Sequence, residues 1–428
     1  MLYKRATEVR LFSLFDLAAL LLGLSALFGW LNQRYLALPS SIGMLGMGLI
    51  ASLLLVLFDV FWPDQTVGRR LTVALRSIDF EQTLMNGLLA FLLFAGGLHL
   101  DVGSLRGRAV PVAVTATIGV LVSTAVIGLG LWAISGPVGY PVPLPWALVF
   151  GALISPTDPV AVLGTLKAVR VPIELETDMK GESLFNDGVG VVVFTLVLAV
   201  AMGEDAGPSH IALLFLHEAV GGVMLGLFTG YLGYRMTRQV DEYSLEVMLS
   251  LALATGTYAV AQVLGTSGPI AVVVAGLVLG SRGASRGMSE RTRRYVFGFW
   301  EVIDYVLNSL LFLLIGLEVL VLQFDAAMAP VALLAVPLAL AGRFISVGGA
   351  VAALGRFVRF PPGTVAVLTW GGLRGGISIA LALSLPDNPA RPGLLAATYA
   401  VAIFTILVQG STLSLVARRR TPVVQTPG

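Results

Sequence analysis

The chain has no cysteine among its 428 residues, and charged side chains make up only 12% of it. The absence of cysteine excludes disulfides, thiolate metal sites and iron–sulfur clusters. Soluble proteins carry about 25% charged residues, so this deficit, beside 57% apolar residues, indicates a membrane protein. Histidine is also scarce. After His217 and Glu218, the second histidine of a zinc HExxH motif would fall on Gly221, which excludes that class of hydrolase.

Long apolar runs dominate what is present. A membrane-spanning helix needs about 20 mostly apolar residues. On that rule the sequence predicts thirteen spans, at 12–31, 40–62, 82–100, 109–135, 144–168, 181–202, 210–235, 245–264, 268–281, 297–322, 330–354, 363–385 and 392–416. Lys4, Arg5 and Arg10 precede the first run as in a signal peptide, but no convincing cleavage site follows. We therefore expect a retained first span.

The basic residues divide unevenly between the two sides that these spans create. Eighteen of the 27 lie on the side of the C-terminus, seven lie on the other side, and Arg343 and Arg374 lie inside spans. Because basic loops face the cytoplasm, we expect a multi-pass protein of the cell (inner) membrane with its N-terminus outside and its C-terminus cytoplasmic. No loop is long enough for a soluble domain, and 417–428 form a short cytoplasmic tail.

Charges at bilayer depth are candidate functional groups, because each costs roughly 2.5–3.5 kcal/mol or more. Snorkelling or pairing explains the acids near span ends, namely Asp16, Asp59, Glu301, Asp304 and Glu318. Arg343 lies deeper, and a structural pairing is favoured for it over a direct role in a site. Three polar clusters remain.

The first cluster is "ISPTDPVAV", 154–162, in the middle of the fifth predicted span. Pro156 and Pro159 flank Thr157 and Asp158, and each proline removes a backbone donor and disrupts the preceding turn. Interrupted backbone at membrane depth is tolerated only inside protein or beside a water-filled cavity. Free carbonyls, a hydroxyl and a carboxylate are hard oxygen donors, so this break predicts a cation site.

The second cluster is "ESLFNDG", 182–188, at the head of the sixth predicted span. On a helix, Ser183, Asn186 and Asp187 share a face, and Glu182 lies at its edge. A helical N-terminus, which favours Glu and Ser, would explain Glu182 and Ser183 without a functional role. It would not explain Asp187, which lies at least a full turn into the apolar run.

The third cluster is "WGGLRGGISIALAL", 370–383, where four glycines surround Arg374. Dense glycine weakens a helix and lets other backbones approach closely. A buried guanidinium needs a partner, and the deep carboxylates available are Glu182, Asp187 and Asp158. A nucleotide-binding GxxxxGK[ST] loop is absent. Spans five and twelve are thus the interrupted pair, a pattern that indicates the substrate site of an alternating-access transporter.

These clusters, in this order, resemble the motifs of the monovalent cation:proton antiporter family, in its NhaP / sodium–proton exchanger branch. The matching stretches are "SPTDPVAV", "GESLFNDG" and "GGLRGG", supported by "FWEVIDYVLNSLLFLLIGLE". The resemblance implies an all-α polytopic membrane protein of the NhaA-like antiporter fold, with about 13 transmembrane helices in two inverted repeats and crossed discontinuous helices. It also implies a homodimer, with a core bundle over about 109–202 and 330–416 and a dimerisation part over about 12–100 and 210–322.

The resemblance also implies roles for the site residues. Asp187 would bind either Na⁺ or H⁺, and Asp158 would be the second acid of the site. Thr157, Ser183 and Asn186 would supply oxygen to the Na⁺ or hold the carboxylates. Glu182 would form a structural ion pair with Arg374. The asparagine before Asp187 marks the branch expected to be electroneutral, exchanging one Na⁺ or Li⁺ for one H⁺ in pH and sodium homeostasis.

One departure from the family keeps an alternative open. Relatives often carry an acid in the third span, where this chain has Ala95, and neither His99 nor Asp101 is assigned as its replacement. K⁺/H⁺ exchange is therefore the close alternative, followed by a cation channel and by a scaffold or sensor that retains the fold. Burial and a second negative charge both favour protonation of a carboxylate, so one site can hold a proton or a cation. No enzymatic chemistry, cofactor or nucleic-acid partner is expected.

Overall fold

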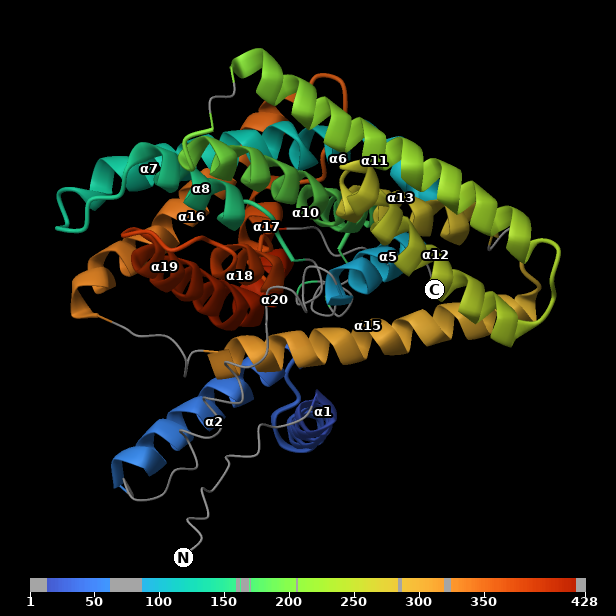
Figure 1. Ribbon diagram of the computed structural model, residues 1–428, viewed down its shortest axis with the longest axis horizontal. Coiled ribbons are helices and arrows are strands. Elements are labelled where there is room, and N and C mark those ends of the chain that lie inside the picture. Colours follow the sequence, from blue (N-terminus) through green and yellow to red (C-terminus); the bar gives the residue numbers. More distant parts are fainter. Residues whose placement is uncertain are drawn as a thin grey trace, which may run out of the picture. The chain divides into compact units, whose positions relative to one another are not determined.

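A computed structural model describes residues 14–61, 87–158, 162, 169, 171–204, 207–283, 287–318 and 325–420 (Figure 1). Every regular element in these residues is helical. Helices satisfy their own backbone groups, as a segment in lipid must. The principal helices are α1 (Leu14–Leu31), α2 (Ser40–Phe61), α5 (Leu89–His99), α6 (Val102–Ala116), α7 (Ile118–Ser135), α8 (Leu144–Ile154), α10 (Ile173–Ala201), α11 (Pro208–Thr237), α12 (Tyr243–Leu264), α13 (Gly268–Val278), α15 (Glu290–Glu318), α16 (Ala329–Leu354), α17 (Thr364–Trp370), α18 (Gly376–Leu383), α19 (Arg391–Phe404) and α20 (Gly410–Arg420).

These helices confirm the predicted membrane spans. In the described residues, nine helical segments are long and apolar enough to cross a membrane, and three shorter apolar helices lie at 89–99, 144–154 and 268–281. The twelfth predicted span is the interrupted pair α17 and α18. Several basic residues used for the orientation, among them Lys4, Arg69 and Lys167, lie outside the described part of the chain.

The helices group into two compact units. The smaller unit contains α1, α2 and the C-terminal part of α15. Within it α2 and α15 approach through glycine, since a Cβ added at Gly48 would lie 3.0 Å from the Leu313 carbonyl oxygen. The hydroxyl of Ser52 donates to the carbonyl of Gly316 at 2.8 Å. Small residues allow this close packing of membrane helices.

The larger unit holds all three polar clusters. In it α13 packs against both α5 and α11 (Figure 1). A Cβ at Gly97 of α5 would lie 2.4 Å from the Val273 carbonyl oxygen, and one at Gly226 of α11 would lie 2.3 Å from that of Ala271. Helices α7, α8, α10 and α16 share an apolar core with α18 and α19. The division into a moving core and a dimerisation part concerns motion and assembly, and it stays a prediction.

Loops that were predicted to share a side contact one another. The Tyr140 hydroxyl, before α8, donates to the Pro389 carbonyl at 3.1 Å and accepts from the Gly393 amide at 3.1 Å. On the other predicted side, Arg108 of α6 donates to the carbonyl of Arg359 at 2.9 Å. These contacts agree with the predicted sides of the four loops involved.

Candidate functional site

The first interruption follows α8, at the position where the prolines predict it. The helix ends at Ile154, and residues 155–158 are not helical. Ser155 and Thr157 are nevertheless buried. Pro159, the second proline of the motif, lies outside the described residues. Irregular backbone is therefore held inside protein, as the membrane requires.

The second interruption separates α17 from α18. Residues 371–375 form a non-helical link in which Leu373 and Arg374 are completely buried. Its backbone is held from the following span, because the Arg374 amide donates to Thr405 Oγ1 at 3.1 Å and Gln409 Nε2 donates to the Trp370 carbonyl at 3.0 Å. Thr405 and Gln409 bound a π-helical segment between α19 and α20. Such segments often occur at functional sites.

The two interruptions cross and satisfy each other's backbone groups. The Asp158 amide donates to the Leu373 carbonyl at 2.9 Å. In return, Nη1 of Arg374 donates to the carbonyls of Ser155 and Pro156. Carbonyls that a broken helix leaves free thus receive a charged donor. The prediction of crossed discontinuous helices is confirmed.

The crossing is close enough to require glycine at position 375. A Cβ added there would lie 2.2 Å from Oδ2 of Asp158 and 2.6 Å from its Cβ. The Gly375 φ of −109° is open to any residue, so the restriction comes from the neighbour and not from the backbone. Position 375 therefore fixes where the Asp158 carboxylate lies.

Gly375→Ala is expected to lower ion exchange about 10- to 100-fold, because displacement of a reacting group by about 1 Å has effects of that size. The measurement is initial exchange rate in proteoliposomes at matched protein content. Gly349→Ala is the control, since a Cβ there meets nothing within 4 Å. Equal rates for the two variants would show that the position of Asp158 is not critical.

The second polar cluster lies on α10, a continuous helix of 29 residues. The helix begins at Ile173, well before the predicted start at residue 181. The alternative that Glu182 and Ser183 belong to a helical N-terminus is therefore wrong, since both lie more than two turns inside. A Cβ at Gly190 would lie 2.3 Å from Cγ of Pro156, so this side of α10 packs directly on the first interruption.

Thr157 is the centre of a hydrogen-bond network with α10. Its Oγ1 lies 3.0 Å from the Ser183 Oγ and accepts from Asn186 Nδ2 at 2.9 Å. The Thr157 amide in turn donates to Asn186 Oδ1 at 3.3 Å. The Asn186 amide is thus used on both sides to hold Thr157. The structure brings together Thr157, Ser183 and Asn186 as predicted.

The two aspartates of the predicted site meet at this network. Asp187 is buried and Asp158 is partly buried, and their carboxylates act on each other electrostatically. Within the described residues no protein group hydrogen-bonds the Asp187 carboxylate. Two carboxylates with the hydroxyls of Thr157 and Ser183 form a set of hard oxygen donors, which suits a small cation or a proton.

The predicted ion pair between Glu182 and Arg374 is wrong in its partner. Both carboxylate oxygens of Glu182 accept hydrogen bonds from Arg343 of α16. Oε2 accepts from Nη2 at 2.8 Å, and Oε1 accepts from Nη1. Arg343 Nε also donates to the Leu368 carbonyl of α17 at 3.2 Å. The structural pairing favoured for Arg343 is thus confirmed, whereas Arg374 is held by backbone carbonyls.

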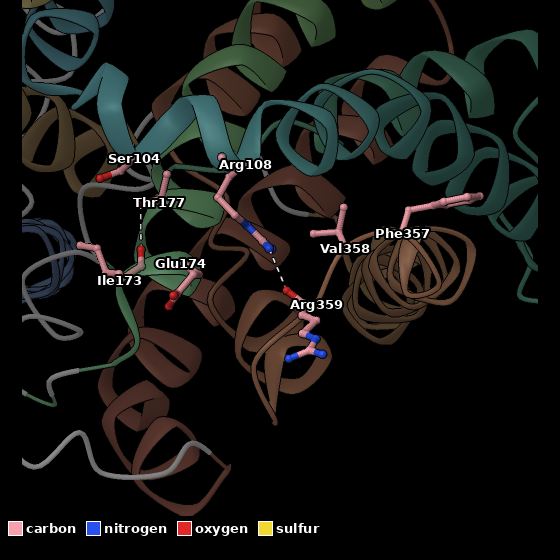
Figure 2. A pocket seen from close by; sticks show the side chains of 9 residues that line it. Ser104, Arg108, Ile173, Glu174, Thr177, Phe357, Val358 and Arg359 are labelled. Carbon is pink, nitrogen blue, oxygen red and sulfur yellow. Dashed lines mark hydrogen bonds between the residues drawn. The ribbon is translucent and has the colours of Figure 1, made fainter.

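A second buried ion pair lies two turns from the site and was missed from the sequence. Arg108 of α6 forms a bidentate pair with Asp178 of α10, one turn before Glu182. Figure 2 shows Arg108 reaching toward the Arg359 carbonyl beside a cavity of about 500 Å³. A charge at each of positions 108 and 178 is the only local signal in the sequence. The pair ties the start of α10 to α6.

The position of the family departure, Ala95, is buried among apolar side chains. Ala95 lies in an apolar cluster with Ala254, Ala275 and Trp300. Asp101 begins α6 as its N-cap, where hydrogen bonds from the Ser104 side chain and from the Ser104 and Gly103 amides hold its pKa below the usual value. Asp101 is therefore a helix cap.

The chain is similar to known proteins over most of its length. Residues 21–419 match the family model described as "Sodium/hydrogen exchanger, transmembrane". The chain is 46% identical over 411 residues to the Na⁺/H⁺ antiporter NhaP of Pseudomonas aeruginosa, covering 94% of this chain and 96% of that protein. It is 38% identical over 343 residues to the Na⁺/H⁺ antiporter NhaH of Halobacillus dabanensis, covering 78% and 82%.

Among solved structures, the chain matches the sodium proton antiporter MjNhaP1 from Methanocaldococcus jannaschii at pH 8. The TM-score is 0.72 at 19% identity, over 94% of this chain and 97% of that one. This likeness establishes a shared fold.

Proposed function

The chain belongs to the sodium/hydrogen exchanger family, and on that premise we propose that it exchanges Na⁺ for H⁺ across the cell membrane by alternating access. The observation that carries the proposal is the buried Asp187 beside Asp158 at the crossing of two interrupted helices. Li⁺ is the expected substitute for Na⁺. The exchange would serve pH and sodium homeostasis.

Asp187 is proposed to bind either ion but not both. A carboxylate in a confined site needs its charge neutralised, which a proton or a Na⁺ ion can do equally well. Asp158, Thr157 and Ser183 would add oxygen ligands to the Na⁺. Asn186 would act as a positioning residue, because its amide holds Thr157 from both sides. Mutually exclusive binding at one site that opens alternately makes exchange obligatory.

We propose an electroneutral exchange of one Na⁺ for one H⁺. The side chain before Asp187 is the neutral amide of Asn186, and that amide is occupied with Thr157. One titrating carboxylate would then carry one charge in each direction. The protein would work as a homodimer in the inner membrane, with its N-terminus outside and its C-terminus cytoplasmic.

Proteoliposomes with an acidic interior test this function. Na⁺ or Li⁺ added outside is expected to dissipate the pH gradient, and setting the membrane potential with valinomycin and K⁺ should leave the initial rate unchanged. The readout is an internal pH dye. Cation uptake without proton efflux would contradict exchange and favour a channel, and a rate that follows the membrane potential would contradict the 1:1 stoichiometry.

A third arm of the same assay separates Na⁺ from K⁺. The curated relatives named above are Na⁺/H⁺ antiporters, and nothing in the site favours K⁺. We therefore expect K⁺ to give less than about one tenth of the Na⁺ rate. Equal rates with K⁺ and Na⁺ would contradict a preference for Na⁺ and would favour K⁺/H⁺ exchange as the function.

A further inference from the structure

A second group of acidic and hydroxyl side chains lies where α12 and α15 begin, away from the crossing. Glu246, in the first turn of α12, is completely buried. Neither of its carboxylate oxygens has a hydrogen-bond partner among the described residues. Burying a carboxylate without a partner is strongly unfavourable, and the positive end of α12 offsets only part of that cost.

Among the described residues, the side chains that act on Glu246 carry oxygen and no positive charge. Asp241 and Thr292 are its neighbours, and the Thr292 hydroxyl lies near enough to the carboxylate to act as a weak donor. Its direct hydrogen bond goes to the Ser289 carbonyl, at 3.2 Å. The Ser289 hydroxyl donates to Asp241 Oδ1 at 2.7 Å and lies 3.2 Å from Thr292 Oγ1. Four side chains near the starts of α12 and α15 are thus neighbours. We call them the α12–α15 cluster: Asp241, Glu246, Ser289 and Thr292.

Two arginines at the start of α15 lie over aromatic rings. The Arg291 guanidinium lies 6.0 Å over the ring of Tyr243, and that of Arg293 lies 6.0 Å over the ring of Phe297. Asp241 and Glu246 take part in none of the ion pairs of the described residues. In the part of the chain that the structure describes, these two carboxylates therefore have no basic partner.

We infer that the α12–α15 cluster binds a small hard monovalent cation of the Na⁺ class, as a second site separate from the crossing. Its donors are two carboxylates, one serine and one threonine, the same set as Asp158, Asp187, Ser183 and Thr157. Asp241 is exposed and Glu246 is buried, so a cation can enter past Asp241 and neutralise Glu246.

The cluster is closed toward the membrane interior. One turn beyond Glu246, the Ser250 hydroxyl accepts from the indole of Trp300 at 2.9 Å. Trp300 is fully buried and packs on Phe94 at a ring distance of 4.7 Å. A cation that enters here leaves by the way it came. The site is therefore one that senses or stores the cation and does not transport it.

Thermal unfolding of the full chain tests this site in the Asp187→Asn background, which removes the exchanged-ion carboxylate. Replacing choline chloride with NaCl at about 300 mM is expected to raise Tm by about 3 °C, because a bound ligand stabilises the folded state. Adding Glu246→Gln should abolish that rise. Adding Glu290→Gln, an exposed acid of the same region, should leave it intact.

Two results would overturn the inference. One is a Tm in Asp187→Asn that is the same in NaCl and choline chloride. The other is a Na⁺-dependent rise that persists when Glu246→Gln is added. If Glu246→Gln does not fold, Asp241→Asn at the exposed entrance is the substitute, and it should at least halve the rise. The experiment measures Na⁺ binding in a variant that does not transport. Its result is therefore independent of whether the proposed exchange is correct.

Discussion

Arg343→Ala is expected to lower the free energy of unfolding by about 3–5 kcal/mol, because removing one member of a buried ion pair leaves the other charge uncompensated. The charge left behind is Glu182, whose side chain is 1% exposed. The same substitution removes the donor to the Leu368 carbonyl. Helix α16 would then lose its Arg343 hydrogen bonds to α10 and α17.

Thermal unfolding in detergent and the yield of folded protein in the membrane measure this effect. The matched control is the double replacement Glu182→Leu with Arg343→Met, since apolar substitution of both partners is often neutral. A double-mutant cycle with Glu182→Gln should give strong coupling for Arg343 and weak coupling for Arg374→Ala. Strong coupling of Glu182 with Arg374 instead would contradict the pairing in the structure.

Asp187→Asn is expected to reduce exchange to the level of empty vesicles while the protein still folds. The amide keeps the shape of the side chain but cannot gain or lose a proton, and it carries no charge to bind Na⁺. Since no described group hydrogen-bonds this carboxylate, its replacement breaks no hydrogen bond in the described part of the protein. Function should therefore be lost without a loss of stability.

The assay is the decay of the pH gradient after Na⁺ addition, with the yield and Tm of the purified variant measured beside it. Asp387→Asn is the control, because the side chain of Asp387 is 98% exposed and its pair with Arg391 lies in a surface loop. Exchange that persists in Asp187→Asn would remove Asp187 from the mechanism and leave Asp158 as the carboxylate to test.

The helices could be predicted from apolar runs, but their ends could not. Helix α10 begins at Ile173 and α6 at Val102, each several residues before the predicted span. The extensions carry charges that lower the apolar average, such as Arg108 and Asp178. These two charges neutralise each other between α6 and α10. A hydropathy count considers one segment at a time, so it cannot predict a pairing between two segments.

The site was predictable where its geometry is local. Positions 183, 186 and 187 share a face by helical spacing alone, and the prolines around Asp158 mark the interruption. The partner of Glu182 was not predictable, because it lies 161 residues away and depends on how α16 packs. The family resemblance implied a carboxylate partner for Arg374. In the structure the guanidinium instead donates to the carbonyls of Ser155 and Pro156, which the broken helix itself makes available.

The bonds between Asn186 and Thr157 have a consequence for how an ion would cross. Asn186 adjoins Asp187 and Thr157 adjoins Asp158, so α10 and the interruption after α8 are joined next to the acids themselves. Opening the site by separating these segments would break that joint on every cycle. We expect the side chains that bind the ion to keep their arrangement while the surrounding helices move. The ion would then meet the same oxygens from either side of the membrane, and its intrinsic affinity would be the same inward and outward.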